Sequence, residues 1–179
     1  MFQKILRYVL LPLSLLTLLG YYWLGGFNEI EIAVVEKPVR PVVGKVYQGQ
    51  YGDLALRKIF VQAQRLLASD SVTGTLLVVN LDSASAGGKQ VNQFIGIALS
   101  APFNSLPSGY QRDTLAAGTY LRARVAAHPL AQPRPGTINE RLSAYAAEHD
   151  ITVSGLPIEF YRAPDTLWVE MAVRQPSSQ

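Results

Sequence analysis

The sequence predicts an α+β domain made of two consecutive β-α-β-β units and preceded by one transmembrane helix. Three observations carry this prediction. An uncharged apolar run lies near the amino terminus, a strand-helix-strand-strand order occurs twice, and both helices of that order are amphipathic. Because two amphipathic helices must bury their apolar stripes on a common surface, we expect an antiparallel sheet with both helices on one face.

Residues 8–27 contain no charged side chain and include eight leucines. As a helix they would span roughly 30 Å, the thickness of the hydrocarbon core of a bilayer. Lys4 and Arg7 precede this run, and aromatic residues end it at 21–23. We therefore predict a single-pass anchor over residues 1–28 of a bacterial inner membrane, with the amino terminus cytoplasmic and the remaining chain periplasmic.

A cleaved signal peptide is the alternative interpretation of the same segment, since it also begins with basic residues. Its cleavage site should show small residues in an Ala-x-Ala-like pattern, and the run ends instead in Gly-Tyr-Tyr-Trp-Leu-Gly-Gly-Phe. The uncleaved anchor is therefore favoured. Its orientation depends on few charges, because Lys37 and Arg40 lie only some ten residues beyond the segment.

The chain has 179 residues, which leaves room for one domain of ordinary size after the apolar segment. It contains no cysteine and only two histidines, His128 and His149, which lack a metal-ligand spacing. The formal net charge of +3 comes from scattered residues without a basic and aromatic cluster. We expect no metal, no cofactor and no nucleic-acid partner, and the sequence identifies no protein partner.

The first unit begins with an extended segment over 29–47 that prolines interrupt. A helix follows, with Asp53 as its expected N-cap and an end near residue 70. Two strands at 75–81 and 93–100 complete the unit. The expected buried face of this helix consists of Leu56, Phe60, Ala63 and Leu67.

The second unit begins after a loop at 101–111, with one strand over 114–125. After a linker at 132–136, Thr137 and Glu140 fit a capping box at the start of a helix. The expected buried face of this helix consists of Ile138, Leu142, Tyr145 and His149. A hairpin over 156–174 closes the unit.

The two arms of that hairpin alternate between different kinds of side chain. In the second arm, one face holds Leu167, Val169, Met171 and Val173, and the other holds Trp168, Glu170, Ala172 and Arg174. In the first arm, Ile158 and Phe160 alternate with Glu159 and Tyr161, and residues 163–166 supply the turn. If the apolar face packs on the helices, we expect the opposite face to bring together Glu159, Tyr161, Trp168 and Glu170.

Two carboxylates and two aromatic rings on one face are typical of a site for a cationic or amphipathic small molecule. The other interpretation is an ordinary solvent-facing surface, because any one-sided antiparallel sheet shows this alternation. A desolvated Glu159 would have a raised pKa, and a bound cation would restore its charged form. Alternatively, Arg122 or Arg124 would neutralise one carboxylate and shift the preference toward neutral or anionic lipids.

The order of these elements and five short motifs resemble the GyrI-like small-molecule-binding family, which includes bacterial effector-binding domains. The motifs are Gly44-Lys-Val-Tyr-Gln-Gly49, Phe94-Ile-Gly-Ile-Ala98, Ala117-Gly-Thr-Tyr120, Leu156-Pro-Ile-Glu-Phe-Tyr161 and Val169-Glu-Met-Ala-Val173. The resemblance covers roughly residues 29 to 174, and we define the domain as residues 29–175, followed by a short tail at 176–179.

The resemblance implies a sheet with two helices on one face and a ligand groove on the other. Glu159 falls at the acidic position that contacts cationic ligands in the family, and Glu170 falls at a second recurrent acidic position. The regulators of this family carry a DNA-binding module, whereas this chain has the apolar segment in that place. We therefore expect a membrane-tethered binding domain without catalytic residues.

Two alternatives remain open. Some family members hydrolyse strained cyclopropane compounds with the groove glutamate, so a hydrolase is the first alternative. No Ser/His/Asp order, phosphate loop or metal cluster is available, which leaves a carboxylate as the only candidate for acid-base or nucleophilic chemistry. A membrane-tethered scaffold or adaptor, which needs no groove, is the second.

Overall fold

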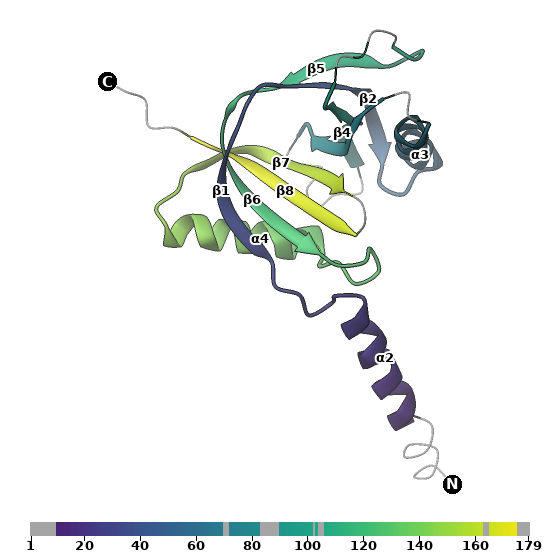
Figure 1. The fold of residues 1–179 in the computed structure, drawn as a ribbon, viewed down its shortest axis with the longest axis vertical. Helices are drawn as coiled ribbons and strands as arrows, with labels where there is room; N and C mark the ends of the chain where they lie inside the picture. The colour runs from purple at the N-terminus through teal and green to yellow at the C-terminus, as the bar shows by residue number, and fades with distance from the viewer. Residues whose placement is uncertain are drawn as a thin grey trace.

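The computed structural model describes residues 10–69, 72–82, 90–101, 103, 106–162 and 165–174. Within these ranges the chain forms an eight-stranded antiparallel sheet and three α-helices, which confirms the α+β class (Figure 1). In chain order the elements are α2 (Leu11–Trp23), β1 (Glu31–Lys37), β2 (Arg40–Gln50), α3 (Leu54–Ala68), β3 (Gly74–Asn80), β4 (Gln90–Leu99), β5 (Gln111–Leu115), β6 (Gly118–Ala126), α4 (Pro135–Glu148), β7 (Val153–Arg162) and β8 (Thr166–Val173).

The duplicated order is present as β2-α3-β3-β4 and β6-α4-β7-β8. In the sheet the strands lie in the order β1-β6-β8-β7-β3-β4-β2-β5, so each unit forms one half and β1 and β5 form the edges. The strand expected over 114–125 is in fact two strands, β5 and β6, which pair with opposite halves of the sheet. The two halves are joined where β7 pairs with β3.

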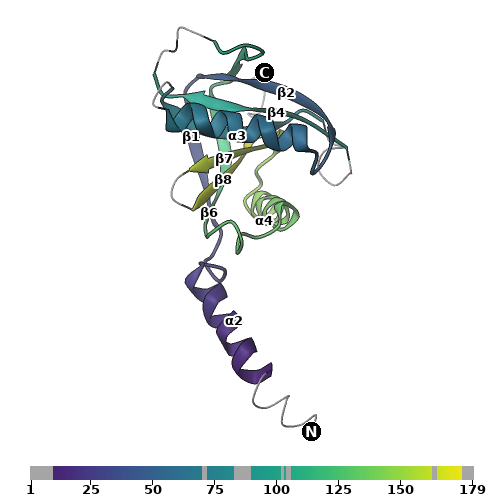
Figure 2. The ribbon, with the colours of Figure 1, turned by 90° about the vertical axis from the view of Figure 1, so that its right-hand side faces the viewer.

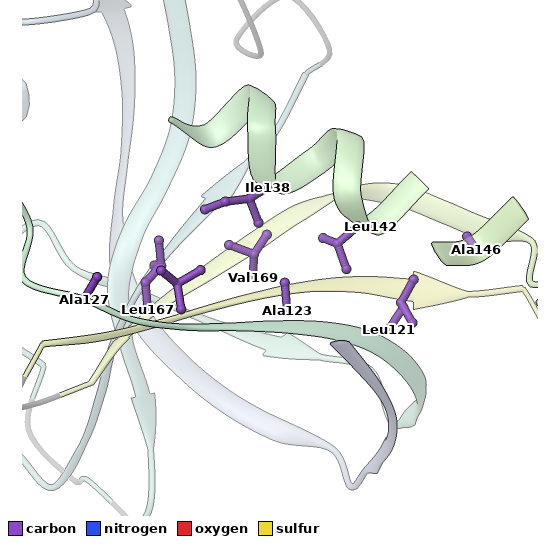
Figure 3. Close-up of a cluster of buried hydrophobic side chains, with 9 residues drawn as sticks. Leu121, Ala123, Ala127, Ile138, Leu142, Ala146, Leu167 and Val169 are labelled. Carbon is purple, nitrogen blue, oxygen red and sulfur yellow. The ribbon is translucent and has the colours of Figure 1, made fainter. Parts of the chain in front are cut away.

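Both helices pack on the same face of this sheet, as their amphipathic patterns predict. From α4, Ile138, Leu142 and Ala146 are buried against strand residues such as Leu121 and Val169 (Figure 3). The helix α3 covers the other half, where the buried Ala63 and partly buried residues such as Phe60 meet side chains of β2, β3 and β4. Removal of these apolar surfaces from water is the main stabilising term of such a layered fold.

The predicted helix starts are only partly correct. Asp53 occupies the N-cap position of α3, but its carboxylate accepts a hydrogen bond from the hydroxyl of Tyr47 at 3.0 Å instead of capping the helix. The helix α4 begins at Pro135, so Thr137 lies inside its first turn and the predicted capping box is wrong. Proline is favoured there because the first turn leaves its N–H groups unpaired in any case.

The helix α2 projects from the domain in both ribbon views, and every one of its residues is exposed (Figures 1 and 2). Its 13 residues correspond to a length of about 20 Å. Among the described residues, no helix combines the length and the apolar character needed to span a bilayer. The start of the predicted anchor, residues 1–9, and the predicted tail, residues 176–179, lie outside the described residues.

Candidate functional site

The hairpin of β7 and β8 lies at the centre of the sheet, between β6 of its own unit and β3 of the other unit. Only four residue pairs join β7 to β3, from the pair of Leu76 and Tyr161 to the pair of Val79 and Ile158. Beyond Leu76 and Tyr161 the two strands diverge. The predicted site residues therefore lie at the junction of the two units.

The four predicted site residues do not share one face, so that part of the prediction is wrong. Phe160 is opposite Trp168, whereas Tyr161 is opposite Leu167 and Glu159 is opposite Val169. Since paired residues of antiparallel strands point to the same side, Glu159 and Tyr161 lie on the face that the helices cover. Trp168 and Glu170 lie on the other face.

The physical reason is the length of the hairpin connection. Arg162 pairs with Thr166, which leaves three residues between the strands, and Asp165 adopts a positive φ of 52° there. The four-residue turn expected at 163–166 would have placed Tyr161 opposite Trp168. A change of one residue in the register turns every side chain of one strand to the opposite face.

On the helix-covered face, Glu159 and Tyr161 form a hydrogen-bonded pair. The hydroxyl of Tyr161 donates to Oε2 of Glu159 at 2.6 Å, and the ring of Phe60 from α3 packs edge-on against Tyr161 at 5.3 Å. Burial raises the pKa of the Glu159 carboxyl above its ordinary value of 4.5, and the hydrogen bond from Tyr161 opposes this shift. The upward direction expected for this carboxyl is thus confirmed.

The same burial, together with the neighbouring carboxylate of Glu159, raises the pKa of the Tyr161 hydroxyl. This hydroxyl therefore stays protonated and can act as a donor at neutral pH. Among the described residues, Glu159 makes no ion pair. The pair thus presents a partly dehydrated carboxylate whose charge no cation of the described chain neutralises.

On the opposite face, Glu170 is fully buried between two arginines. Its Oε1 accepts a hydrogen bond from Nε of Arg122 at 2.8 Å, and its Oε2 accepts one from Arg40 at 2.8 Å. These two arginine side chains are only 13% and 18% exposed, respectively. Arg122 thus neutralises one of the two carboxylates, as one of the sequence alternatives expected, and Glu170 is not open to a cationic ligand.

The indole ring of Trp168 lies beside this ion-pair cluster. The guanidinium carbons of Arg122 and Arg162 lie 3.9 Å and 4.1 Å from its ring centre, within the range of cation-π contacts. Nε1 of Trp168 is buried and has no hydrogen-bond partner among the described residues. The ring therefore faces cations of the protein itself.

A cavity of about 580 Å³ opens where β3 and β7 diverge, within the size range of small-molecule sites. It is lined by Leu67, Val72, Thr73, Gly74, Thr75, Leu76, Arg124, Tyr161, Arg162, Thr166 and Trp168. Two of the predicted site residues, Tyr161 and Trp168, belong to this lining. Glu159 and Glu170 do not, although Glu159 accepts the hydrogen bond of Tyr161.

Sequence reasoning missed Arg40, Arg162 and Phe60 as members of this region. The alternation of β6 already places Arg122 and Arg124 on one face, so the neutralisation of Glu170 could be anticipated. The contribution of Arg40 could not, because it comes from a strand of the other unit. Among the described residues, no group of three or more potential ligands could hold a metal ion.

No family model and no curated protein matches this chain. Solved structures do match. EcmrR, in a complex with DNA, has a TM-score of 0.62 at 12% identity over 97% of this chain and 70% of that chain. SAV2435 bound to tetraphenylphosphonium has a TM-score of 0.51 at 17% identity over 80% of this chain and 94% of that chain. A hydrolase from Listeria innocua has a TM-score of 0.59 at 8% identity over 83% and 95% of the two chains.

At these identities the similarity concerns the fold alone. The family resemblance also implied a ligand groove on the face away from the helices. In this chain, that face carries a buried core and the cluster around Glu170. Glu159, which makes no ion pair with the described residues, lies on the helix-covered side.

Replacing Glu170 by glutamine should lower the free energy of unfolding by about 3 to 5 kcal/mol, because it leaves two largely buried guanidinium groups without an anion. Urea unfolding followed by circular dichroism measures this change. The matched control is Glu31→Gln, whose exposed pair with Arg124 should contribute less than about 1 kcal/mol. Equal, small losses for both variants would show that the buried cluster is not a structural element.

Proposed function

We propose that this chain is a membrane-tethered small-molecule-binding domain that recognises a cationic or amphipathic ligand through Glu159. The observation that carries the proposal is the half-buried carboxylate of Glu159, which Tyr161 orients and no cation of the described chain neutralises. Burial of such a group is unfavourable, and a bound cation would relieve the cost. This residue is also the acidic position to which the family resemblance points.

The solved structures support this proposal through what their names state. The structure of SAV2435 contains tetraphenylphosphonium, a lipophilic cation. The structure of EcmrR contains DNA, and its chain is longer than this one. Of these two, the first gives the more direct comparison for the domain. We therefore assign the same class of ligand, a bulky cation with apolar substituents, to the helix-covered side of β7.

The apolar body of such a ligand would lie along the ring of Tyr161 in the cavity. Leu67, Val72 and Leu76 supply the apolar wall at that end. Each cation-π contact, with Tyr161 or with Phe60 beside it, would contribute on the order of 0.5 to 2 kcal/mol. Trp168 would contact the ligand only at the far end of the cavity, and Glu170 would act indirectly by holding the strands in place.

A hydrolase is the second candidate, and one observation favours it. A carboxyl with a raised pKa that is hydrogen-bonded to a protonated tyrosine is a suitable general acid, and one solved structure of this fold is named a hydrolase. The scaffold alternative has no such observation in its favour. Turnover during a binding experiment separates the two candidates, because a binding domain releases its ligand unchanged.

Replacing Glu159 by glutamine should weaken binding of tetraphenylphosphonium tenfold or more, since the charged contact contributes about 1.5 to 3 kcal/mol. Equilibrium dialysis of the full-length protein in an uncharged detergent measures the dissociation constant, and chromatography of the same samples detects any product. The control is Glu148→Gln, which removes an exposed carboxylate from the end of α4. If Glu159→Gln binds the cation as tightly as the parent chain, Glu159 is not the recognition residue.

The membrane tether is supported by residues 8–27 and by α2, an apolar helix with no buried residue. The described part of the domain does not bury this helix, and insertion into a bilayer would bury it. We propose an inner-membrane location with a cytoplasmic amino terminus and a periplasmic domain.

After expression in bacteria, the full chain should stay with the membranes after a sodium carbonate wash. A chain that lacks residues 1–28 should appear in the soluble fraction, because nothing else in the sequence has the length to span a bilayer. Immunoblotting of the two fractions gives the distribution. Recovery of the full chain in the carbonate supernatant would contradict the tether.

A further inference from the structure

The cavity at the junction of β3 and β7 passes from one face of the sheet to the other. Leu76 and Tyr161 pair with each other and pack into the helix-facing cores. Because side chains alternate along a strand, the adjacent lining residues Thr75 and Arg162 point to the opposite face. Trp168 packs in the core of that opposite face. The cavity therefore has an apolar end below the helices and a second end on the other side of the sheet.

The second end is basic. Arg124 and Arg162 line it, together with the hydroxyl-bearing residues Thr75 and Thr166, and no described lining residue carries a carboxylate. Arg162 makes no ion pair among the described residues. Arg124 binds Glu31 through Nη1 only, which leaves Nε and Nη2 as further donors. Two guanidinium groups thus remain available to an acceptor at this end.

The surroundings of this end hold more positive than negative charge. Arg40 and Arg122 bind the buried carboxylate of Glu170, and the side chains of Lys37 and Arg162 lie over the neighbouring ring of Trp168. These four cations and one anion leave a formal surplus of three positive charges. Burial lowers the pKa of Lys37, and the neighbouring charge of Arg122 lowers it further. An additional anion would be stabilised at this place.

Two buried donors of the same cluster also lack an acceptor among the described residues, namely Nε of Arg40 and Nε1 of Trp168. Buried donors are normally paired in folded proteins, and those left unpaired often mark a place for a missing partner. The unpaired donors and the surplus of positive charge therefore point to the same kind of partner, one that accepts hydrogen bonds and is negatively charged.

We propose that the basic end of the cavity binds the acid group of a small amphipathic organic anion, such as a sulfonate, carboxylate or phosphate attached to an aromatic body. Arg162 and Arg124 bind the acid group, and the body lies between the rings of Trp168 and Tyr161. Guanidinium groups suit this role because their planar donors match two oxygens of one acid group. The two proposed ligands would share the ring of Tyr161, but the acid group of the anion binds Arg124 and Arg162 and not Glu159.

Isothermal titration of the full-length protein in an uncharged detergent, with the heat of detergent alone subtracted, tests this proposal. The probe is naphthalene-2-sulfonate, and naphthalene-2-sulfonamide serves as its neutral counterpart with the same ring system. We expect the sulfonate to bind at least tenfold more tightly than the sulfonamide at low ionic strength. Equal binding of the two compounds would overturn the proposal.

Variants locate the site. Arg162→Gln should reduce the preference for the sulfonate to less than threefold, and Arg124→Gln should reduce it in the same direction. Arg57→Gln, which removes an exposed arginine of α3 outside the cavity, should keep the full preference. An unchanged preference in both cavity variants, with circular dichroism spectra like that of the parent, would refute the assignment.

Glu159→Gln distinguishes this proposal from the preceding one. It should leave the dissociation constant of naphthalene-2-sulfonate within about twofold of the parent value, because Glu159 does not line the cavity. If that variant loses the cation and keeps the anion, both sites are supported. If it loses both, binding of the anion also depends on Glu159, and the assignment of its acid group to Arg124 and Arg162 is wrong.

Discussion

The pairing of Arg162 with Thr166 fixes the register of the central hairpin, and the arrangement of the site depends on it. This register places Glu159 and Tyr161 under the helices and Trp168 and Glu170 on the opposite face. A register shifted by one residue would bring both carboxylates to the same face, where they would repel each other. The three-residue connection therefore separates one carboxylate with a structural role from one that makes no ion pair with the described residues.

Glu170 shows how the fold uses the first of these carboxylates. Arg122 comes from the neighbouring strand of the same unit, and Arg40 comes from β2 of the other unit. The buried carboxylate thus links the two halves of the sheet, which few backbone pairs join directly. Such a cluster contributes specificity more than net stability, because desolvation of the charges offsets much of their attraction.

Periodicity was sufficient to predict most of the fold. The spacing of apolar residues predicts the buried faces of both helices, which include Ile138 and Leu142 of α4 and Ala63 of α3. The strand and helix signals predict the order of elements in the two units. The split between β5 and β6 and the start of α4 at Pro135 were missed because short-range boundary signals compete with tertiary pairing.

The candidate site was only partly predictable. The alternation of side chains within β7 and within β8 is as predicted. Which residues of the two strands face the same side depends on one residue of the connection between them. Sequence alone also could not reveal that Arg40 reaches Glu170, since the two residues are 130 positions apart. Both alternation and resemblance predict Glu159 as a site residue, although the structure places it on the face opposite to the expected one, and burial raises the pKa of its carboxyl.

The different roles of the two glutamates can be tested most directly by carbon NMR of protein labelled at the glutamate carboxyl carbons. Substitution of each glutamate by glutamine assigns the two signals. On titration with tetraphenylphosphonium, we expect the Glu159 signal to shift and the pKa of this carboxyl to fall toward its ordinary value, because a bound cation favours the charged form. The Glu170 signal should stay in place. A shift of Glu170 with an unchanged Glu159 would contradict the assignment of recognition to Glu159.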